Sequence, residues 1–237
     1  MEIRRAHRYL ARPGDRARHV FLLVDGWAAR YRLLSDGRRQ ITGLFVPGDF
    51  CDLAWRHAKT LAQHVIALTP IRAFRIDIGK LEQQIECDPG ARSIVDDEAY
   101  RAWETQCEWL VSLGRRTAIE RLAYLFCELV QRVGRVNAQG AGMCQMPLTQ
   151  VDIADIAGLT PVHVNRTLQQ MRRSGLIELK SKQLRLPDFA TLRKIALFQP
   201  NPEAGRLRNS VSTAFRLVEG SAEGTSRIDE GDRLVFA

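Results

Sequence analysis

One short segment, from Thr149 to Gly175, constrains the fold of this 237-residue chain more than any other. Thr149 and Asp152 have the spacing of a helix start, apolar residues then recur at helical spacing, and Gly158 ends this first helix. Thr160 can cap a second helix, and the proline after it stands at the first helical position, where a missing N–H is no loss. Two short helices bent around one glycine are typical of a helix-turn-helix.

The second helix of this segment has one face for a core and one for a partner. Val164, Leu168 and Met171 fall on the same side and predict the buried face. The remaining side chains can meet base edges, phosphates or thymine methyl groups in a major groove. The alternative is a two-helix hairpin inside an ordinary core. We predict DNA contacts from Thr160, Val162, His163, Asn165, Arg166 and Gln169.

Two short strand-like runs, separated by Ser181 and Lys182, follow the second helix. They predict a small hairpin of the kind that forms the wing of a winged helix. Lys180, Lys182 and Arg185 would then face the phosphates beside the groove. The charge distribution agrees, since residues 115–198 hold 13 Lys and Arg against 6 Asp and Glu, in a chain of net charge +8.

The N-terminal part, residues 1–88, has a different pattern. From about residue 20 to residue 78, short apolar runs are broken by turn signals, among them Asp25-Gly26 and Asp36-Gly37. Asp-Gly between strand-like runs favours a type I′ hairpin turn, because both central residues of that turn have positive φ. Many short antiparallel strands at this spacing predict a small barrel or sandwich.

A long helix is predicted over residues 89–114. Its apolar residues form two adjacent lines, one with Val95, Ala99, Ala102, Gln106, Trp109 and Leu113 and one with Tyr100, Trp103, Cys107 and Leu110. One line against its own domain and one against a partner helix would explain both, which predicts dimerisation; burial within a monomer is the alternative. The acidic residues would lie on the solvated side: Asp96, Asp97, Glu98, Glu104 and Glu108. The pattern breaks at Ser112-Leu113-Gly114.

The rest of the chain divides into a helical region and a polar end. Thr117 and Glu120 have capping-box spacing at the start of a helix that Gly134 ends. Residues 187–197 predict one more short helix after the hairpin. Residues 199–237 are rich in Gly, Ser and Glu and poor in long apolar runs, so we expect a flexible tail there.

This order of parts resembles the Crp/Fnr family of bacterial transcription regulators. The resemblance covers roughly residues 10–198 and is carried by "PGDF" at 47–50, "TAIERLAYLF" at 117–126, "LTQVDIADIAGLTPVHVNRTL" at 148–168 and the wing. It implies an α+β fold with an antiparallel, jelly-roll-like β-roll sensor (1–88), a dimerisation helix (89–114) and a winged helix-turn-helix DNA-binding domain (115–198). It further implies a homodimer on double-stranded promoter DNA, with RNA polymerase and a small-molecule effector as other partners.

The sequence departs from the family pattern where a cofactor or effector would bind. Cys51-Asp52-Leu53 replaces the Gly-Glu-Leu of cyclic-nucleotide-binding members, and neither Arg56 nor Lys59 is followed by Ser. A cyclic phosphate needs a cation together with free backbone donors, so we expect no cyclic nucleotide. The first cysteine of the chain is Cys51, which argues against an iron–sulfur cluster held by N-terminal cysteines. The spacing is irregular for haem or a metal on Cys51, His57 and His64, and we predict no cofactor.

Other properties bound the function. Many family members carry an acidic residue where Val162 stands, so their usual DNA half-site should not be transferred to this chain. The five cysteines form no C-x-x-C pair, and no apolar run approaches the ~20 residues of a membrane span, so we expect a soluble, cytoplasmic protein. No glycine-rich phosphate loop or nucleophile–base pattern favours an enzyme. The rival to a regulated transcription factor is an architectural DNA-binding protein whose β-domain is only a dimerisation scaffold.

Overall fold

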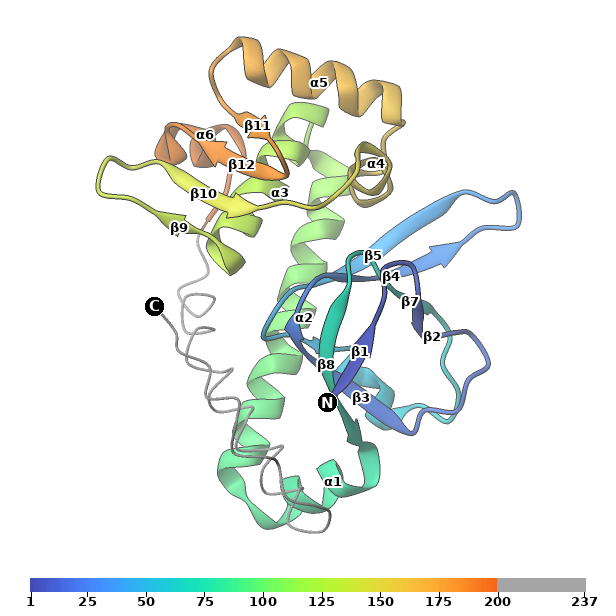
Figure 1. The fold of residues 1–237 in the computed structure, drawn as a ribbon. Coiled ribbons are helices and arrows are strands. Elements are labelled where there is room, and N and C mark those ends of the chain that lie inside the picture. The colour runs from blue at the N-terminus through green and yellow to red at the C-terminus, as the bar shows by residue number, and fades with distance from the viewer. Residues whose placement is uncertain (200–237) are drawn as a thin grey trace.

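The computed structural model describes residues 1–199, so the tail predicted at 199–237 lies outside the described residues apart from its first position. Two antiparallel four-stranded sheets form the N-terminal part, which we call the β-roll (Figure 1). One sheet consists, in order, of β1 (Glu2–Arg4), β8 (Ile71–Asp77), β3 (His19–Asp25) and β6 (Phe50–Cys51). The other consists of β2 (Tyr9–Ala11), β7 (His64–Ala67), β4 (Ala28–Leu33) and β5 (Arg39–Phe45). The predicted β-sandwich is confirmed, although β1 and β2 were not among the predicted strands.

Of the two predicted hairpins, only the one at Asp36-Gly37 forms; the prediction for Asp25-Gly26 is wrong, because this turn joins β3 of one sheet to β4 of the other. Gly26 joins β3 to β4 with φ of 82°, and Gly37 joins β4 to β5 with φ of 86°. Asp25 and Asp36 do not have positive φ, so neither turn is type I′. A Cβ on Gly26 would lie 2.1 Å from the Pro70 carbonyl oxygen, so the close approach of the backbone requires glycine there.

Helices connect the β-roll to the rest of the molecule. A single 3-10 turn, η1 (Leu53–His57), follows β6, and α1 (Ile78–Cys87) follows β8 as a helix that the sequence pattern did not predict. The long helix α2 (Pro89–Arg115) begins at Asp88, whose carboxylate accepts a bond from the N–H of Gly90 at 2.8 Å. The helix predicted over residues 89–114 ends one residue later, at Arg115, and continues through Ser112-Leu113-Gly114, where its apolar pattern breaks.

Helix α2 presents one line of residues to its own domain and leaves another side open. The buried line differs from both predicted lines and consists of Ala91, Val95, Glu98, Trp109 and Ser112. The prediction that Glu98 is solvated is wrong: the residue is 8% exposed, because it lies on this line and has Arg101 as an ion-pair partner one turn later. The exposed side carries Ala99, Tyr100, Ala102, Trp103, Gln106 and Leu110.

The C-terminal part contains helices on a small sheet. Its helices are α3 (Ala118–Val133), α4 (Gln150–Ala157), α5 (Pro161–Arg173) and α6 (Phe189–Ile195). Its sheet consists, in order, of β11 (Glu178–Lys180), β12 (Gln183–Leu186), β10 (Gly142–Gln145) and β9 (Arg135–Val136). One buried cluster joins Tyr31 and Ile41 of the β-roll to Leu122, Ile153 and Val164. The C-terminal part therefore packs directly on the β4–β5 end of the β-roll. Within residues 1–199, no helix is both long and apolar enough to cross a membrane.

Candidate nucleic-acid interface

The helix ends that create the two-helix turn are those that the sequence predicts. The Thr149 hydroxyl accepts a bond from the N–H of Asp152 (3.1 Å), and the Asp152 carboxylate accepts one from the N–H of Thr149 (3.0 Å). Gly158 ends α4 in the left-handed region, with φ of 62°. Thr160 caps α5, its hydroxyl accepting a bond from the N–H of His163 at 3.2 Å. These local bonds fix where α4 stops and α5 begins.

Helix α5 lies at the end of the molecule opposite α1, with α4 near its N-terminus (Figure 1). It buries Val164, Thr167, Leu168 and Met171 in the core. Val162 is 71% exposed, so its side chain points away from this core. The side chains exposed beside it are Thr160, His163, Arg166 and Gln169. The exposed face of α5 thus brings together most of the residues that the sequence predicts as DNA contacts.

Asn165 is half-buried, and its amide is held on both sides. Its Nδ2 donates to Oε1 of Gln150 at 3.0 Å, and its Oδ1 accepts a bond from Nε2 of Gln169 at 2.9 Å. The chain of three amides joins the first residue of α4 to the exposed face of α5. The sequence analysis did not name Gln150 as a site residue. It could have been found from its position, because it is the first residue of α4, directly after the predicted cap Thr149.

The hairpin between β11 and β12 has the predicted wing shape. Ser181 and Lys182 both have positive φ (50° and 60°), so this turn, and not the Asp-Gly turns, has the backbone of a type I′ hairpin. The N–H of Met146 donates to the carbonyl of Lys182 at 2.8 Å and fixes the turn against the body. Lys180 and Lys182 are exposed at the tip. Arg185, in contrast, pairs across the strands with Glu178, which reduces its availability for phosphate.

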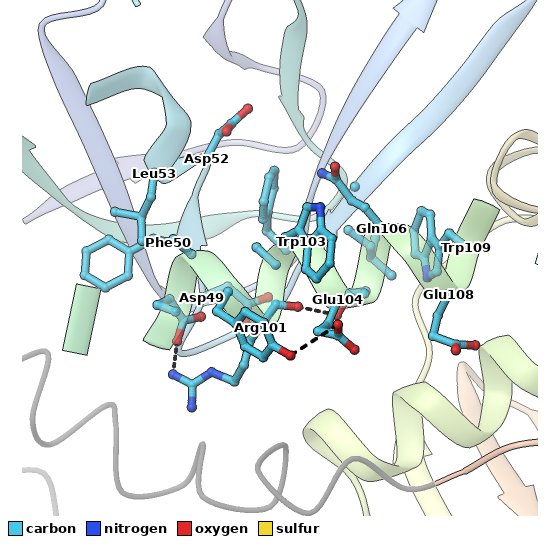
Figure 2. Close-up of a pocket in the computed structure, with 18 of the residues that line it drawn as sticks. Asp49, Phe50, Asp52, Leu53, Arg101, Trp103, Glu104, Gln106, Glu108 and Trp109 are labelled. Atoms are coloured by element: carbon cyan, nitrogen blue, oxygen red, sulfur yellow. Dashed lines mark hydrogen bonds and ion pairs between the residues drawn. The ribbon is translucent and has the colours of Figure 1, made fainter. Parts of the chain in front are cut away.

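A second feature is a cavity of about 790 Å³ between the β-roll, α2 and α3 (Figure 2). Six carboxylates line it: Asp49, Asp52, Glu98, Glu104, Glu108 and Glu128. Its four arginines each have a carboxylate partner, in the pairs Arg30–Asp52, Arg56–Glu82, Arg101–Glu98 and Arg132 with both Asp49 and Glu128. An added phosphate would therefore have to compete with a carboxylate for each of these arginines.

The three residues considered for haem or a metal are not brought together. Cys51 is fully buried, and burial raises the pKa of its thiol well above the ordinary value. The ring of His64 stacks on Tyr31, with centroids 4.7 Å apart. Within the part of the chain that the structure describes, no group of three or more His, Cys, Asp or Glu side chains could hold a metal ion.

Comparisons with known proteins agree with this arrangement. Residues 120–195 match the model of the Crp-like helix-turn-helix domain, and residues 3–88 match that of the cyclic nucleotide-binding domain. The solved structure of FixK2 from Bradyrhizobium japonicum superposes with a TM-score of 0.74 at 24% identity, covering 84% of this chain and 98% of that one.

Curated relatives extend the similarity over both parts of the chain. The nitrogen fixation regulation protein FixK of Azorhizobium caulinodans is 30% identical over 180 residues, which are 76% of this chain and 72% of that protein. The transcriptional activator protein FnrL of Cereibacter sphaeroides is 30% identical over 183 residues, 76% of this chain and 73% of that protein. An alignment of this length must include the long helix and the helix-turn-helix together with part of the β-roll. The chain belongs to the Crp/Fnr family of DNA-binding transcription regulators and is not an enzyme.

Proposed function

We propose that the protein binds two-fold-related promoter DNA as a homodimer and reads its sequence with α5. The observation that carries this proposal is the exposed face of α5, where Val162, His163 and Arg166 point away from the core. Arg166 can read guanine, and Val162 can pack on a thymine methyl group. Lys180 and Lys182 on the wing would hold the flanking phosphates. Thr160, Asn165 and Gln169 complete the proposed interface.

The open side of α2 supports the homodimer. Tyr100, Trp103 and Leu110 are each more than half exposed on one helix, together with Ala99 and Ala102. Large apolar side chains gathered on one helix face mark an interaction surface. A second copy of the same helix would cover them through a self-complementary contact, as a two-fold axis requires.

We propose a separate role for each of the three parts of the fold. We assign sensing to residues 1–88, dimerisation to 89–114 and DNA binding to 115–198. The cavity beside α2 is the place where we expect a signal to act, because α2 and α3 both line it. Its excess of carboxylates and its aromatic residues favour a neutral or cationic effector over a phosphate. RNA polymerase is the proposed partner at the promoter, in line with relatives named as transcriptional activators.

Selection of bound duplexes from a random library, followed by footprinting, tests this function. We expect an inverted repeat whose two halves are protected, together with a dimer in sedimentation. Binding of all duplexes with equal affinity would favour the architectural alternative. Mass spectrometry of the purified protein, followed by binding assays with and without any ligand found, then tests the regulation.

A further inference from the structure

The β4–β5 hairpin of the β-roll holds the first helix of the helix-turn-helix. Nε of Arg39 lies 2.6 Å from Oδ2 of Asp155, and its Nη2 lies 2.9 Å from Oδ1 of Asp152. The next residue, Gln40, donates from Nε2 to the carbonyl of Ile156 at 3.2 Å. The contacts join residues more than 110 positions apart, and Figure 1 shows the hairpin beside α4. We call this set of bonds the Arg39 clasp.

The Arg39 clasp is partly shielded from water and has a fixed geometry. The side chains of Arg39, Asp152 and Asp155 are 25%, 13% and 19% exposed. The guanidinium also lies over the ring of Tyr31, 5.4 Å from its centroid, and the Tyr31 hydroxyl is 3.0 Å from that of Tyr9. Because two carboxylates and a ring fix the arginine together, the contact resists screening better than a surface ion pair does.

A second arginine holds the C-terminal end of the same helix. Arg121 of α3 donates from Nη1 to the carbonyl of Ala157 (2.9 Å) and from Nη2 to the carbonyl of Leu113 (2.8 Å). The first carbonyl belongs to the last residue of α4, and the second to the last turns of α2. Helix α4 is thus tied to the β-roll by Arg39 and to the proposed dimer helix by Arg121.

We propose that Arg39 is a positioning residue that fixes the direction of α5 relative to α2 and so sets which half-site spacing the dimer accepts. This inference rests on the proposed function, because it needs two copies of α5 on one duplex. Two recognition helices must enter major grooves about one helical turn apart. A change of one base pair moves one half-site by about 3.4 Å and rotates it, which a rigidly held α5 cannot follow. Without the Arg39 clasp, α4 and α5 can tilt together and follow it.

Binding to duplexes of altered spacing tests the positioning role. The duplexes carry the selected inverted repeat with its native spacer or with one base pair added or removed. We expect Arg39→Gln to bind the native spacing about tenfold more weakly and the altered spacings almost unchanged, so that discrimination falls about tenfold. Arg38→Gln is the matched control: its side chain is 77% exposed and pairs only locally with Asp36, so discrimination should remain that of the wild type.

Two further variants keep the outcome interpretable if Arg39→Gln folds poorly. Asp155→Asn removes one partner without touching the Thr149–Asp152 cap and should lower discrimination in the same direction. The double variant Arg39→Asp/Asp155→Arg, which exchanges the two partners, should restore part of the discrimination between spacings. An equal loss of affinity on all spacings, or no loss, overturns the positioning role while the proposed function stands. If the wild type itself shows no two-fold, spacing-dependent binding, both the proposed function and this inference are wrong.

Discussion

The indole N–H of Trp109 donates to the carboxylate of Glu128 at 2.7 Å, which joins the proposed dimer helix α2 to α3 within the core. The other oxygen of Glu128 pairs with Arg132 at 2.9 Å, and Arg132 also pairs with Asp49 from the turn before β6. Three elements of different domains therefore meet in one buried charged cluster. Any movement of α2 relative to the β-roll must rearrange this cluster.

Replacement of Arg132 should strongly destabilise the fold. Arg132→Met would leave the carboxylates of Asp49 and Glu128 buried without a cation, at a cost of about 3–5 kcal/mol in the free energy of unfolding. Chemical denaturation followed by circular dichroism measures this cost. Arg135→Ala, an exposed arginine three residues later, is the control and should change stability by less than about 0.5 kcal/mol. A similar, small effect of both substitutions would contradict a structural role for the cluster.

Glu98 should make stability depend on pH in the neutral range. Its burial, with the negative charge of Asp49 nearby, raises the pKa of Glu98 from 4.5 to about 7, although Arg101 and Arg132 oppose the shift. In this window the folded protein holds a proton that the unfolded chain has lost, so the free energy of unfolding falls as pH rises from about 4.5 to about 7. The fall should reach about 3 kcal/mol at most.

The variant Glu98→Gln replaces the titrating carboxyl group by an amide, so residue 98 no longer makes the free energy of unfolding depend on pH. As pH rises from 5 to 7.5, we expect the wild type to lose stability relative to Glu98→Gln. Above pH 7.5 the difference in their free energies of unfolding should stay constant. Denaturant titrations at four pH values measure the difference. Asp97→Asn, the exposed neighbour, should give a difference that barely changes with pH. A flat curve for Glu98→Gln would mean that the carboxyl group titrates normally.

The sequence pattern was most informative where local chemistry decides structure. The ends of α4 and α5 depend on Thr149, Gly158 and Thr160, whose bonds reach only three or four residues along the chain, and these ends were predicted. The burial of Glu98 was not predicted, because helical spacing alone cannot tell which side of an amphipathic helix meets a β-roll. The Arg39 clasp could not be predicted either, since it joins residues that only the tertiary fold brings together.

The type of each turn illustrates the same limit. Asp-Gly is a strong signal for a hairpin, and a hairpin does form at Asp36-Gly37. The N–H of Leu34 donates to the carbonyl of Arg38 at 2.8 Å, so three residues and not two span the turn, and of these only Gly37 has positive φ. Ser181-Lys182 adopts the two positive φ angles without any glycine, because the strands and the anchor at Met146 impose them.

Ala102→Glu should weaken the homodimer. Ala102 is exposed on the open side of α2, and a glutamate there would place two like charges near each other across a two-fold axis. Sedimentation over a range of concentrations should show a dimer dissociation constant at least tenfold higher than that of the wild type. Gln139→Glu adds the same charge at an exposed position in the β9–β10 turn, away from α2, and should leave the dimer intact. An unchanged dimer for Ala102→Glu would exclude this face of α2 as the interface.

Arg166 and Lys182 should differ in how they affect DNA binding. Arg166 lies on the exposed face of α5, so Arg166→Ala should weaken binding to the selected site by roughly 1–3 kcal/mol and binding to a scrambled duplex much less. Lys182→Asn removes the charge at the wing tip while asparagine tolerates the positive φ of 60° there. It should weaken binding to both duplexes alike and lower the salt slope by about 0.9 for each phosphate that the protein no longer neutralises.

Binding isotherms on the selected and scrambled duplexes at several salt concentrations separate base reading from phosphate binding. Asp97→Asn, on the surface of α2, serves as the control for both variants. Equal losses of affinity on the two duplexes for Arg166→Ala, with a reduced salt slope, would show that this arginine holds phosphate. Sequence reading would then have to come from the other exposed residues of α5, His163 and Val162, and the proposed role of Arg166 would be wrong.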